Sequence, residues 1–139
     1  MKKVLLDTNA YTRLLRGDKD VLEALGRADT VFISVFVLGE LYAGFKGGDR
    51  ESENRAQLDD FLRRPTVRIL AASQETSDIF GSIKHRLKKA GTPIPINDVW
   101  IAAHATESGS HLVTFDSQFT SVAGLLIWRT PVSDEEAKS

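Results

Sequence analysis

Short, uninterrupted runs of apolar residues alternate along the chain with longer stretches in which apolar residues recur every three or four positions. The apolar runs lie at residues 3–6, 31–34, 67–70 and 111–114, and a weaker one lies at 125–128. Such runs are typical of strands that are buried on both faces of a parallel sheet. The pattern therefore predicts about five parallel strands.

The stretches between these runs predict helices. Asn9 is placed to cap a helix that ends at Gly17, and a second helix is expected over about 19–27. Two more helices are expected over VFVLGELYAG and over ESENRAQLDDFLRR, the second of which ends at Pro65. Ser73 begins a longer helix. The apolar residues on one side of this helix are Ile79, Phe80, Ile83, Leu87 and Ala90.

Strands that alternate with helices require crossover connections, which place helices on both faces of a parallel sheet. We therefore expect an α/β fold, a three-layer α/β/α sandwich, with one domain over residues 1–131. Residues 132–139 are polar and predict a C-terminal tail.

Composition and charge exclude several classes of protein. The 139 residues contain no cysteine, which excludes disulfides, thiolate metal sites and thiol nucleophiles and is compatible with a reducing cytoplasm. Asp7 interrupts the N-terminal apolar run before it reaches signal-peptide length, and the longest apolar run is too short to span a bilayer. We expect a cytoplasmic protein without membrane association. Its net charge of −1 means that any nucleic acid must be held by local charges.

Four carboxylates occupy unusual positions in this pattern. A further helix is predicted to start near Asp98, and Asp98 falls within its apolar stripe. Glu40 falls within the apolar stripe of the helix predicted over VFVLGELYAG, and Asp7 and Asp116 follow predicted strands. Ligands of open parallel sheets bind beyond the carboxyl ends of the strands, so we expect the four acids to converge there. Ionised carboxylates near a core are costly unless a cation compensates them, and ligands that are all oxygen favour Mg²⁺ or Mn²⁺.

Each acid also has an ordinary structural interpretation. Asp98 could complement the dipole of its helix, with Asn97 as the cap. Asp7 and Asp116 could be turn residues whose side chains bind the backbone just downstream. Glu40 could pair with an arginine. The expected convergence of all four at one edge of the sheet favours a functional site.

Four segments of the sequence resemble, in order, the motifs of the PIN-domain ribonucleases, and among these the VapC-type toxins of toxin–antitoxin pairs. They are LLDTNAYTRLL, SVFVLGELYAG, INDVWIAAHA and HLVTFDSQFTSVAGLLIW. The resemblance runs from residue 4 to about residue 128. It implies a five-stranded α/β/α fold and an acidic site made of Asp7, Glu40, Asp98 and Asp116.

The resemblance also implies a metal-dependent endoribonuclease that hydrolyses RNA with Mg²⁺ or Mn²⁺ and leaves a 5′-phosphate and a 3′-hydroxyl. In that mechanism Asp7 and Asp98 are the principal ligands, and Asp116 and Glu40 complete the site directly or through water. Thr114 and Asn97 are candidates for orienting a carboxylate or a water. Thr8 and Asn9 are interpreted as a turn residue and a cap.

As a type II toxin the chain would form a homodimer and bind a small cognate antitoxin protein. Two alternatives stay open at this point: an RNA-processing or structure-specific nuclease of the same superfamily without a toxin role, and a binding module with vestigial acids. The motifs of zinc proteases, serine hydrolases and P-loop NTPases are missing from the sequence. Replacing Asp7 or Asp98 by alanine is expected to abolish cleavage and to leave the metal-free fold intact or steadier.

Overall fold

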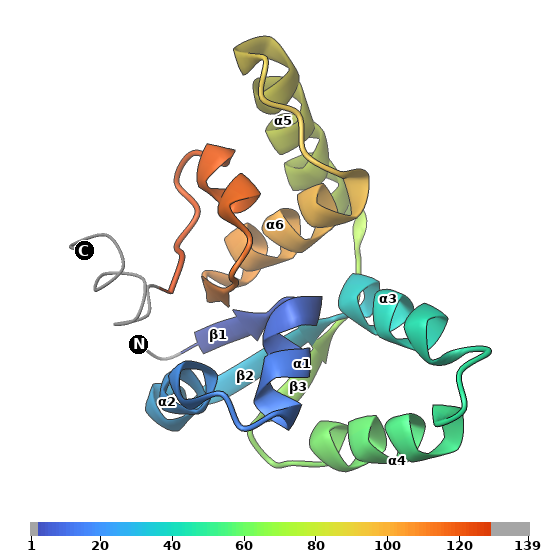
Figure 1. Cartoon of the computed structure of the whole chain (residues 1–139). Helices are drawn as coiled ribbons and strands as arrows, with labels where there is room; N and C mark the ends of the chain where they lie inside the picture. Colours follow the sequence, from blue (N-terminus) through green and yellow to red (C-terminus); the bar gives the residue numbers. More distant parts are fainter. Residues whose placement is uncertain (1–2, 129–139) are drawn as a thin grey trace, which may run out of the picture.

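The computed structural model describes residues 3–128, which form a parallel sheet between layers of helices (Figure 1). The strands are β1 (Lys3–Leu6), β2 (Thr30–Ser34), β3 (Val67–Leu70) and β4 (His111–Val113). All neighbouring strands are parallel and their order is β3-β2-β1-β4. The predicted α/β/α architecture is confirmed, and the polar tail predicted at residues 132–139 lies outside the described residues.

The fifth predicted strand, at residues 125–128, is reduced to a single bridge between Ile127 and Leu112 of β4. Two hydrogen bonds form it. The Leu112 amide donates to the Leu126 carbonyl at 2.8 Å, and the Trp128 amide donates to the Leu112 carbonyl at 2.9 Å. Only one residue of β4, Leu112, pairs with this segment, whereas all three residues of β4 pair with β1. The sheet therefore has four strands instead of about five.

The helices occupy the predicted stretches between the strands. They are α1 (Thr8–Leu15), α2 (Lys19–Arg27), α3 (Val35–Phe45), α4 (Glu51–Leu62), α5 (Gln74–Ala90), α6 (Ile96–Ser108) and the short 3-10 helix η1 (Ser117–Ser121). In Figure 1, α6 lies above the sheet, and α5 projects away from the sheet and packs chiefly along α6. Within residues 3–128, no helix is long and apolar enough to cross a membrane.

Helix ends agree with the sequence in α5 and differ in α1. The Ser73 hydroxyl and Thr76 form a capping box at the start of α5, and Gly91 ends it in the left-handed region with φ 73°. Helix α1, in contrast, is capped by Asp7 and not by Asn9, because it begins two residues earlier than predicted. On α5, Ala90 is exposed although it was predicted to lie on the apolar side.

The strand order creates a switch point beside β1. The chain runs outward from β1 through β2 to β3 and then returns to β4 on the other side of β1. The crevice at the carboxyl ends of β1 and β4 is therefore the expected binding position of this fold. Three consecutive residues of β1, Val4, Leu5 and Leu6, are fully buried, so a rigid strand presents the residue that follows them.

Candidate active site

The four predicted carboxylates line one cavity of about 230 Å³ at this switch point. Asp7 comes from the end of β1, Glu40 from α3, Asp98 from α6 and Asp116 from the segment after β4. The rest of the lining consists of Thr8, Asn9, Ile101 and Phe119. Segments far apart in the sequence thus bring their acids together.

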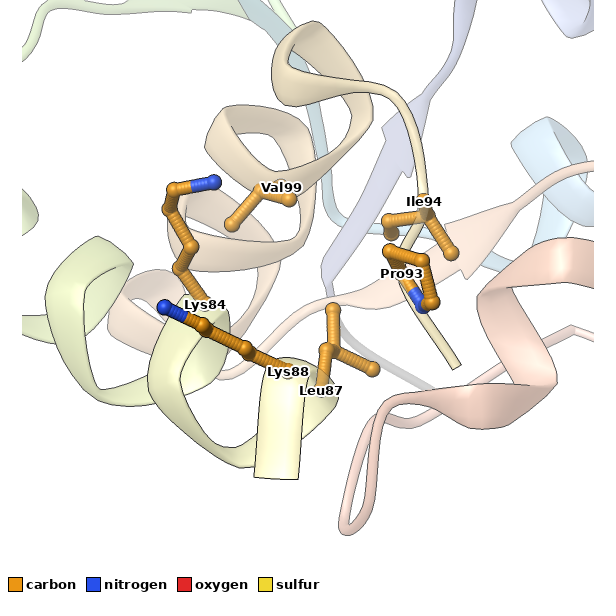
Figure 2. A pocket seen from close by; sticks show the side chains of 6 residues that line it. All are labelled: Lys84, Leu87, Lys88, Pro93, Ile94 and Val99. Carbon is orange, nitrogen blue, oxygen red and sulfur yellow. The ribbon is translucent and has the colours of Figure 1, made fainter. Parts of the chain in front are cut away.

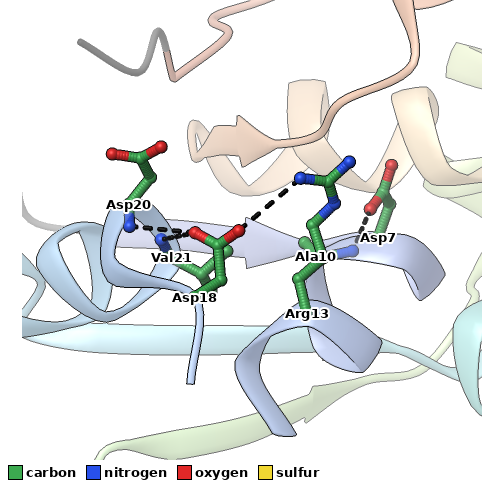
Figure 3. A network of polar contacts seen from close by, with 6 residues as sticks. All are labelled: Asp7, Ala10, Arg13, Asp18, Asp20 and Val21. Carbon is green, nitrogen blue, oxygen red and sulfur yellow. Dashed lines mark hydrogen bonds and ion pairs between the residues drawn. The ribbon is translucent and has the colours of Figure 1, made fainter. Parts of the chain in front are cut away.

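Asp7 is the most buried of the four, with only 5% of its surface exposed. Its Oδ1 accepts a 2.8 Å hydrogen bond from the Ala10 amide, as Figure 3 shows, and its Oδ2 accepts one from the Thr114 hydroxyl. The interpretation of Asp7 as a turn residue whose side chain binds the backbone just downstream is therefore correct. Each carboxylate oxygen has a second lone pair, so capping leaves Asp7 able to bind a cation.

Burial raises the pKa of the Asp7 carboxyl above 3.8. The hydrogen bonds from Thr114 and Ala10 oppose this shift, and the neighbouring Asp116 and Glu40 add to it. The ionised form of Asp7 is thus costly in the folded chain without a compensating cation.

Asp98 lies in the first turn of α6 and is half-buried. Within residues 3–128 no hydrogen-bond donor reaches its carboxylate, and the cap position of α6 is held by Pro95 and not by Asn97. Burial, followed by repulsion from Asp116, Glu40 and Asp7, raises its pKa to about 6. A helix dipole alone would lower this pKa, so burial and the neighbouring charges outweigh the dipole.

Glu40 is exposed, so its predicted place in the buried stripe of its helix is wrong. Helix α3 buries Val37, Leu38 and Leu41 instead. Glu40 stands at the rim of the cavity, where its Oε1 accepts a 2.6 Å hydrogen bond from the Thr8 hydroxyl. Thr8, interpreted from the sequence only as a turn residue, is thus a partner of one of the four acids.

Thr114 links two of the acids. Its hydroxyl donates to Oδ2 of Asp7 and accepts a 3.0 Å hydrogen bond from the Asp116 amide. The Asp116 carboxylate in turn accepts from the Gln118 amide at 2.9 Å and caps η1. Asn97 behaves differently. Its side chain donates to the Phe36 carbonyl at 3.4 Å and is not part of the cavity lining, so it joins α6 to α3.

The chemistry of the four acids suits a hard divalent cation. The four carboxylates offer only oxygen, and no ion pair within residues 3–128 involves any of them. Arg13 of α1 pairs with Asp18 instead, with its Nη1 3.5 Å from the Asp18 Oδ2 (Figure 3). Its guanidinium carbon also lies 3.8 Å from the centre of the Phe115 ring. The negative charge is therefore uncompensated, as a site for a hard cation requires.

The carboxylates do not form a finished coordination cage. Across the described part of the chain, no three His, Cys, Asp or Glu side chains are grouped to hold a metal ion as they stand. Two of the four acids, Asp7 and Glu40, accept hydrogen bonds from hydroxyls, and Asp98 and Asp116 are only partly buried. A bound cation would offset the repulsion between these carboxylates.

His104 is a polar group that the sequence did not single out. It is fully buried, and its Nδ1 lies 2.8 Å from the Ser34 hydroxyl while its Nε2 lies 3.2 Å from the Ala71 carbonyl. Because a carbonyl only accepts, Nε2 carries the proton and Nδ1 accepts from Ser34. Ser34 also caps α3. His104 therefore locks the helix that carries Asp98 to the start of the helix that carries Glu40.

Comparison with known proteins identifies the family of this chain. The sequence model of the PIN domain matches residues 4–125. Ribonuclease VapC2 of Haemophilus influenzae is 36% identical over 118 residues, which are 82% of this chain and 86% of that protein. Ribonuclease VapC2 of Rickettsia felis is 30% identical over 128 residues, covering 88% and 94% of the two chains.

Solved structures give the same answer for the fold. The structure of VapBC2 from Rickettsia felis bound to a DNA fragment from its promoter contains a chain that superposes with a TM-score of 0.79 at 26% identity, covering 91% of this chain and 97% of that one. DNA-bound VapBC from Salmonella typhimurium gives a TM-score of 0.80 at 26% identity, covering 92% and 98%. The chain belongs to the PIN domain family and, within it, to the VapC ribonucleases.

Proposed function

We propose that the chain is a metal-dependent endoribonuclease that acts as the toxin of a type II toxin–antitoxin pair. The observation that carries the proposal is the convergence of four uncompensated carboxylates on one cavity at the switch point of the sheet. The similarity to VapC ribonucleases supports the substrate class, RNA. It also favours the toxin over a processing nuclease of the same superfamily.

In this proposal Asp7 and Asp98 are the principal ligands of Mg²⁺ or Mn²⁺, and Asp116 and Glu40 complete the site directly or through water. When bound, the ion supplies positive charge to the scissile phosphate and a nucleophile that is competent at neutral pH. Because the pKa of Asp98 is about 6 without a cation, this carboxylate is mostly ionised at neutral pH and ready to bind one.

The remaining groups either accept a proton or hold the acids in place. Glu40 is exposed at the rim and held by Thr8, so it is placed to accept a proton from an attacking water. Thr114 holds Asp7 and the backbone of Asp116 in fixed relation. Hydrolysis by water would leave a 5′-phosphate and a 3′-hydroxyl on the RNA.

The proposal extends to partners and location. The similar chains from Rickettsia felis and Salmonella typhimurium belong to VapBC complexes, which supports a cognate antitoxin protein for this chain. We further propose that the chain forms a homodimer and acts in the cytoplasm, where its lack of cysteines is compatible with reducing conditions.

The test is cleavage of total RNA by the purified chain with Mg²⁺, with Mn²⁺ and with EDTA. We expect cleavage with either ion, none with EDTA, and 5′-phosphate ends when the products are sequenced. Asp98→Asn, which keeps the volume of the side chain and removes its charge, should lose cleavage by at least 100-fold. Cleavage that persists in EDTA, or native activity of the Asp98→Asn variant, would overturn the proposal.

A further inference from the structure

A second cavity lies on the other side of the start of α6. It has a volume of about 170 Å³ and is formed by α5, the segment between α5 and α6, and the first turn of α6 (Figure 2). Its lining consists of Lys84, Leu87, Lys88, Pro93, Ile94 and Val99. We call it the α5–α6 pocket. Figure 2 shows the two lysines on one side and Pro93 with Ile94 on the other.

The pocket combines an apolar interior with a cationic edge. Leu87 and Val99 are buried, whereas Lys84 and Lys88 are exposed. Apolar walls with a few polar groups at the edge are typical of ligand sites. This volume is smaller than the roughly 300–1,000 Å³ of sites for drug-sized molecules, so the pocket suits one flat ring and not a large ligand.

The cations beside the pocket have no carboxylate partners. Helix α5 carries four of them within six residues: Lys84, Arg86, Lys88 and Lys89. None takes part in an ion pair with any residue between 3 and 128. The negative end of the α5 dipole accounts for the two in the last turn, Lys88 and Lys89, but Lys84 and Arg86 lie farther from that end. These exposed cations are therefore available to an external anion such as a phosphate.

The first turn of α6 lies between this pocket and the cavity that the four acids line. Asp98 lines the acidic cavity, and its neighbour Val99 lines the α5–α6 pocket. Successive residues of an α-helix point about 100° apart, so this one turn separates the two hollows. No side chain caps α6, so its N-terminal amides add positive potential between them. A polyanionic chain that crosses this turn would reach both.

We propose that the α5–α6 pocket holds one nucleotide of the RNA that flanks the scissile phosphate. The base lies against Pro93, Ile94 and Val99, and Lys84 and Lys88 bind the adjacent phosphates. Contacts of this kind accept any base, because each base has an apolar face and each nucleotide has a phosphate. The inference rests on the proposed ribonuclease function and adds to it the position of a substrate contact.

The first test removes the phosphate contacts. The double variant Lys84→Gln/Lys88→Gln is compared with Arg16→Gln/Lys19→Gln, which removes the same charge from two exposed residues at the other end of the molecule, at the end of α1 and the start of α2. The readouts are kcat and KM on a labelled single-stranded RNA, and binding of that RNA in EDTA at several salt concentrations.

We expect KM to rise about tenfold for Lys84→Gln/Lys88→Gln with kcat within twofold of wild type. The slope of log binding constant against log salt should fall by about 0.7 for each lost phosphate contact. The control pair should change KM less than twofold. Equal effects of the two pairs would mean that only the overall charge matters and would overturn the proposal.

The second test removes part of the apolar wall without changing charge. Ile94→Ala should raise KM roughly three- to fivefold and leave the salt slope at the wild-type value. An unchanged KM would show that no base enters the pocket. The thermal midpoint of each variant checks that it is folded.

Other occupants give different results. If the lysine pair changes the oligomeric state or the binding of an antitoxin and leaves KM for RNA unchanged, the pocket belongs to a protein partner and the proposal is wrong. If wild type cleaves RNA and the variants have the same KM as wild type, the nucleotide contact is refuted but the proposed function stands. If wild type neither cleaves nor binds RNA, the proposed function fails together with this inference.

Discussion

The hydroxyl of Thr8 donates a 2.6 Å hydrogen bond to Oε1 of Glu40, which joins the first residue of α1 to an exposed position on α3. Thr8 directly follows Asp7 in the chain. The same turn therefore contains one of the four acids, Asp7, and contacts a second one, Glu40. A long exposed glutamate ordinarily samples several rotamers, and fixing it costs entropy. The tether to Thr8, and not burial, therefore holds Glu40 at the cavity.

Thr8→Val keeps the shape of the side chain and removes the hydrogen bond. Because Glu40 is exposed, we expect a loss of about 1 kcal/mol in transition-state stabilisation, or a three- to tenfold lower kcat/KM for RNA. Thr8→Ser keeps the hydroxyl and should retain most of the activity. Steady-state cleavage of one labelled RNA by the three proteins measures this, and equal rates for valine and threonine would refute the tether.

Asp98 makes the stability of the metal-free chain depend on pH. Its folded pKa of about 6 lies above its ordinary value of 3.8. Between these two pH values the folded state holds more protons than the unfolded state. The stabilisation that protonated Asp98 gives the folded state is therefore fully present below pH 3.8 and is lost as the pH rises through about 6.

Asp98→Asn should therefore be more stable than wild type at pH 8 and should lose this advantage below pH 4. The shift of about two units corresponds to roughly 3 kcal/mol, which solvent screening of a half-buried group reduces to about 1 kcal/mol. Urea unfolding in EDTA at pH 8, 6 and 4 measures the difference between the two proteins. A difference that is the same at all three pH values would contradict the assigned pKa.

Asp7 differs from Asp98 because its carboxylate also caps α1 and accepts from Thr114. Asp7→Ala and Asp7→Asn both remove the charge, but only asparagine keeps an oxygen for the Ala10 amide. We expect the alanine variant to be less stable than the asparagine variant by about 1 kcal/mol, as loss of a helix cap costs. Both should lose RNA cleavage.

The sequence alone predicts that alanine at position 7 leaves the metal-free fold intact or steadier, and the cap adds a cost that this expectation did not include. Urea unfolding of both variants in EDTA at one pH isolates the cap, because the relief of repulsion is the same in each. Equal stability of the two variants would mean that the hydrogen bond to Ala10 contributes nothing.

The sequence predicts most of the fold because strands buried on both faces leave nearly continuous apolar runs, as Val4, Leu5 and Leu6 do. It misplaces Glu40 because α3 is apolar almost all round, so its buried side cannot be read from periodicity. It misses His104 for another reason. The partners of this histidine, Ser34 and Ala71, are 70 and 33 residues away in the chain, and no local pattern brings such residues together.

His104 provides a pH dependence of the opposite sign to that of Asp98. Burial lowers the pKa of its imidazole below 6.5, while the Ala71 carbonyl and the charge of Glu107 partly oppose the shift. The neutral ring fits its two partners, because protonation would point a second N–H at the Ser34 hydroxyl. The unfolded state takes up a proton below pH 6.5 that the folded state resists, so the contribution of His104 is present above pH 6.5 and is lost as the pH falls.

His104→Ala leaves the Ser34 hydroxyl and the Ala71 carbonyl without their buried partner, so we expect it to lower the free energy of unfolding by about 3 kcal/mol at pH 8. The gap to wild type should narrow as the pH falls from 7 to 5, because wild type alone loses the contribution of the neutral ring. Urea unfolding of both proteins across this range measures the gap. A gap that widens toward pH 5 would mean that the folded chain holds His104 protonated, and the assignment of its hydrogen to Nε2 alone would then be wrong.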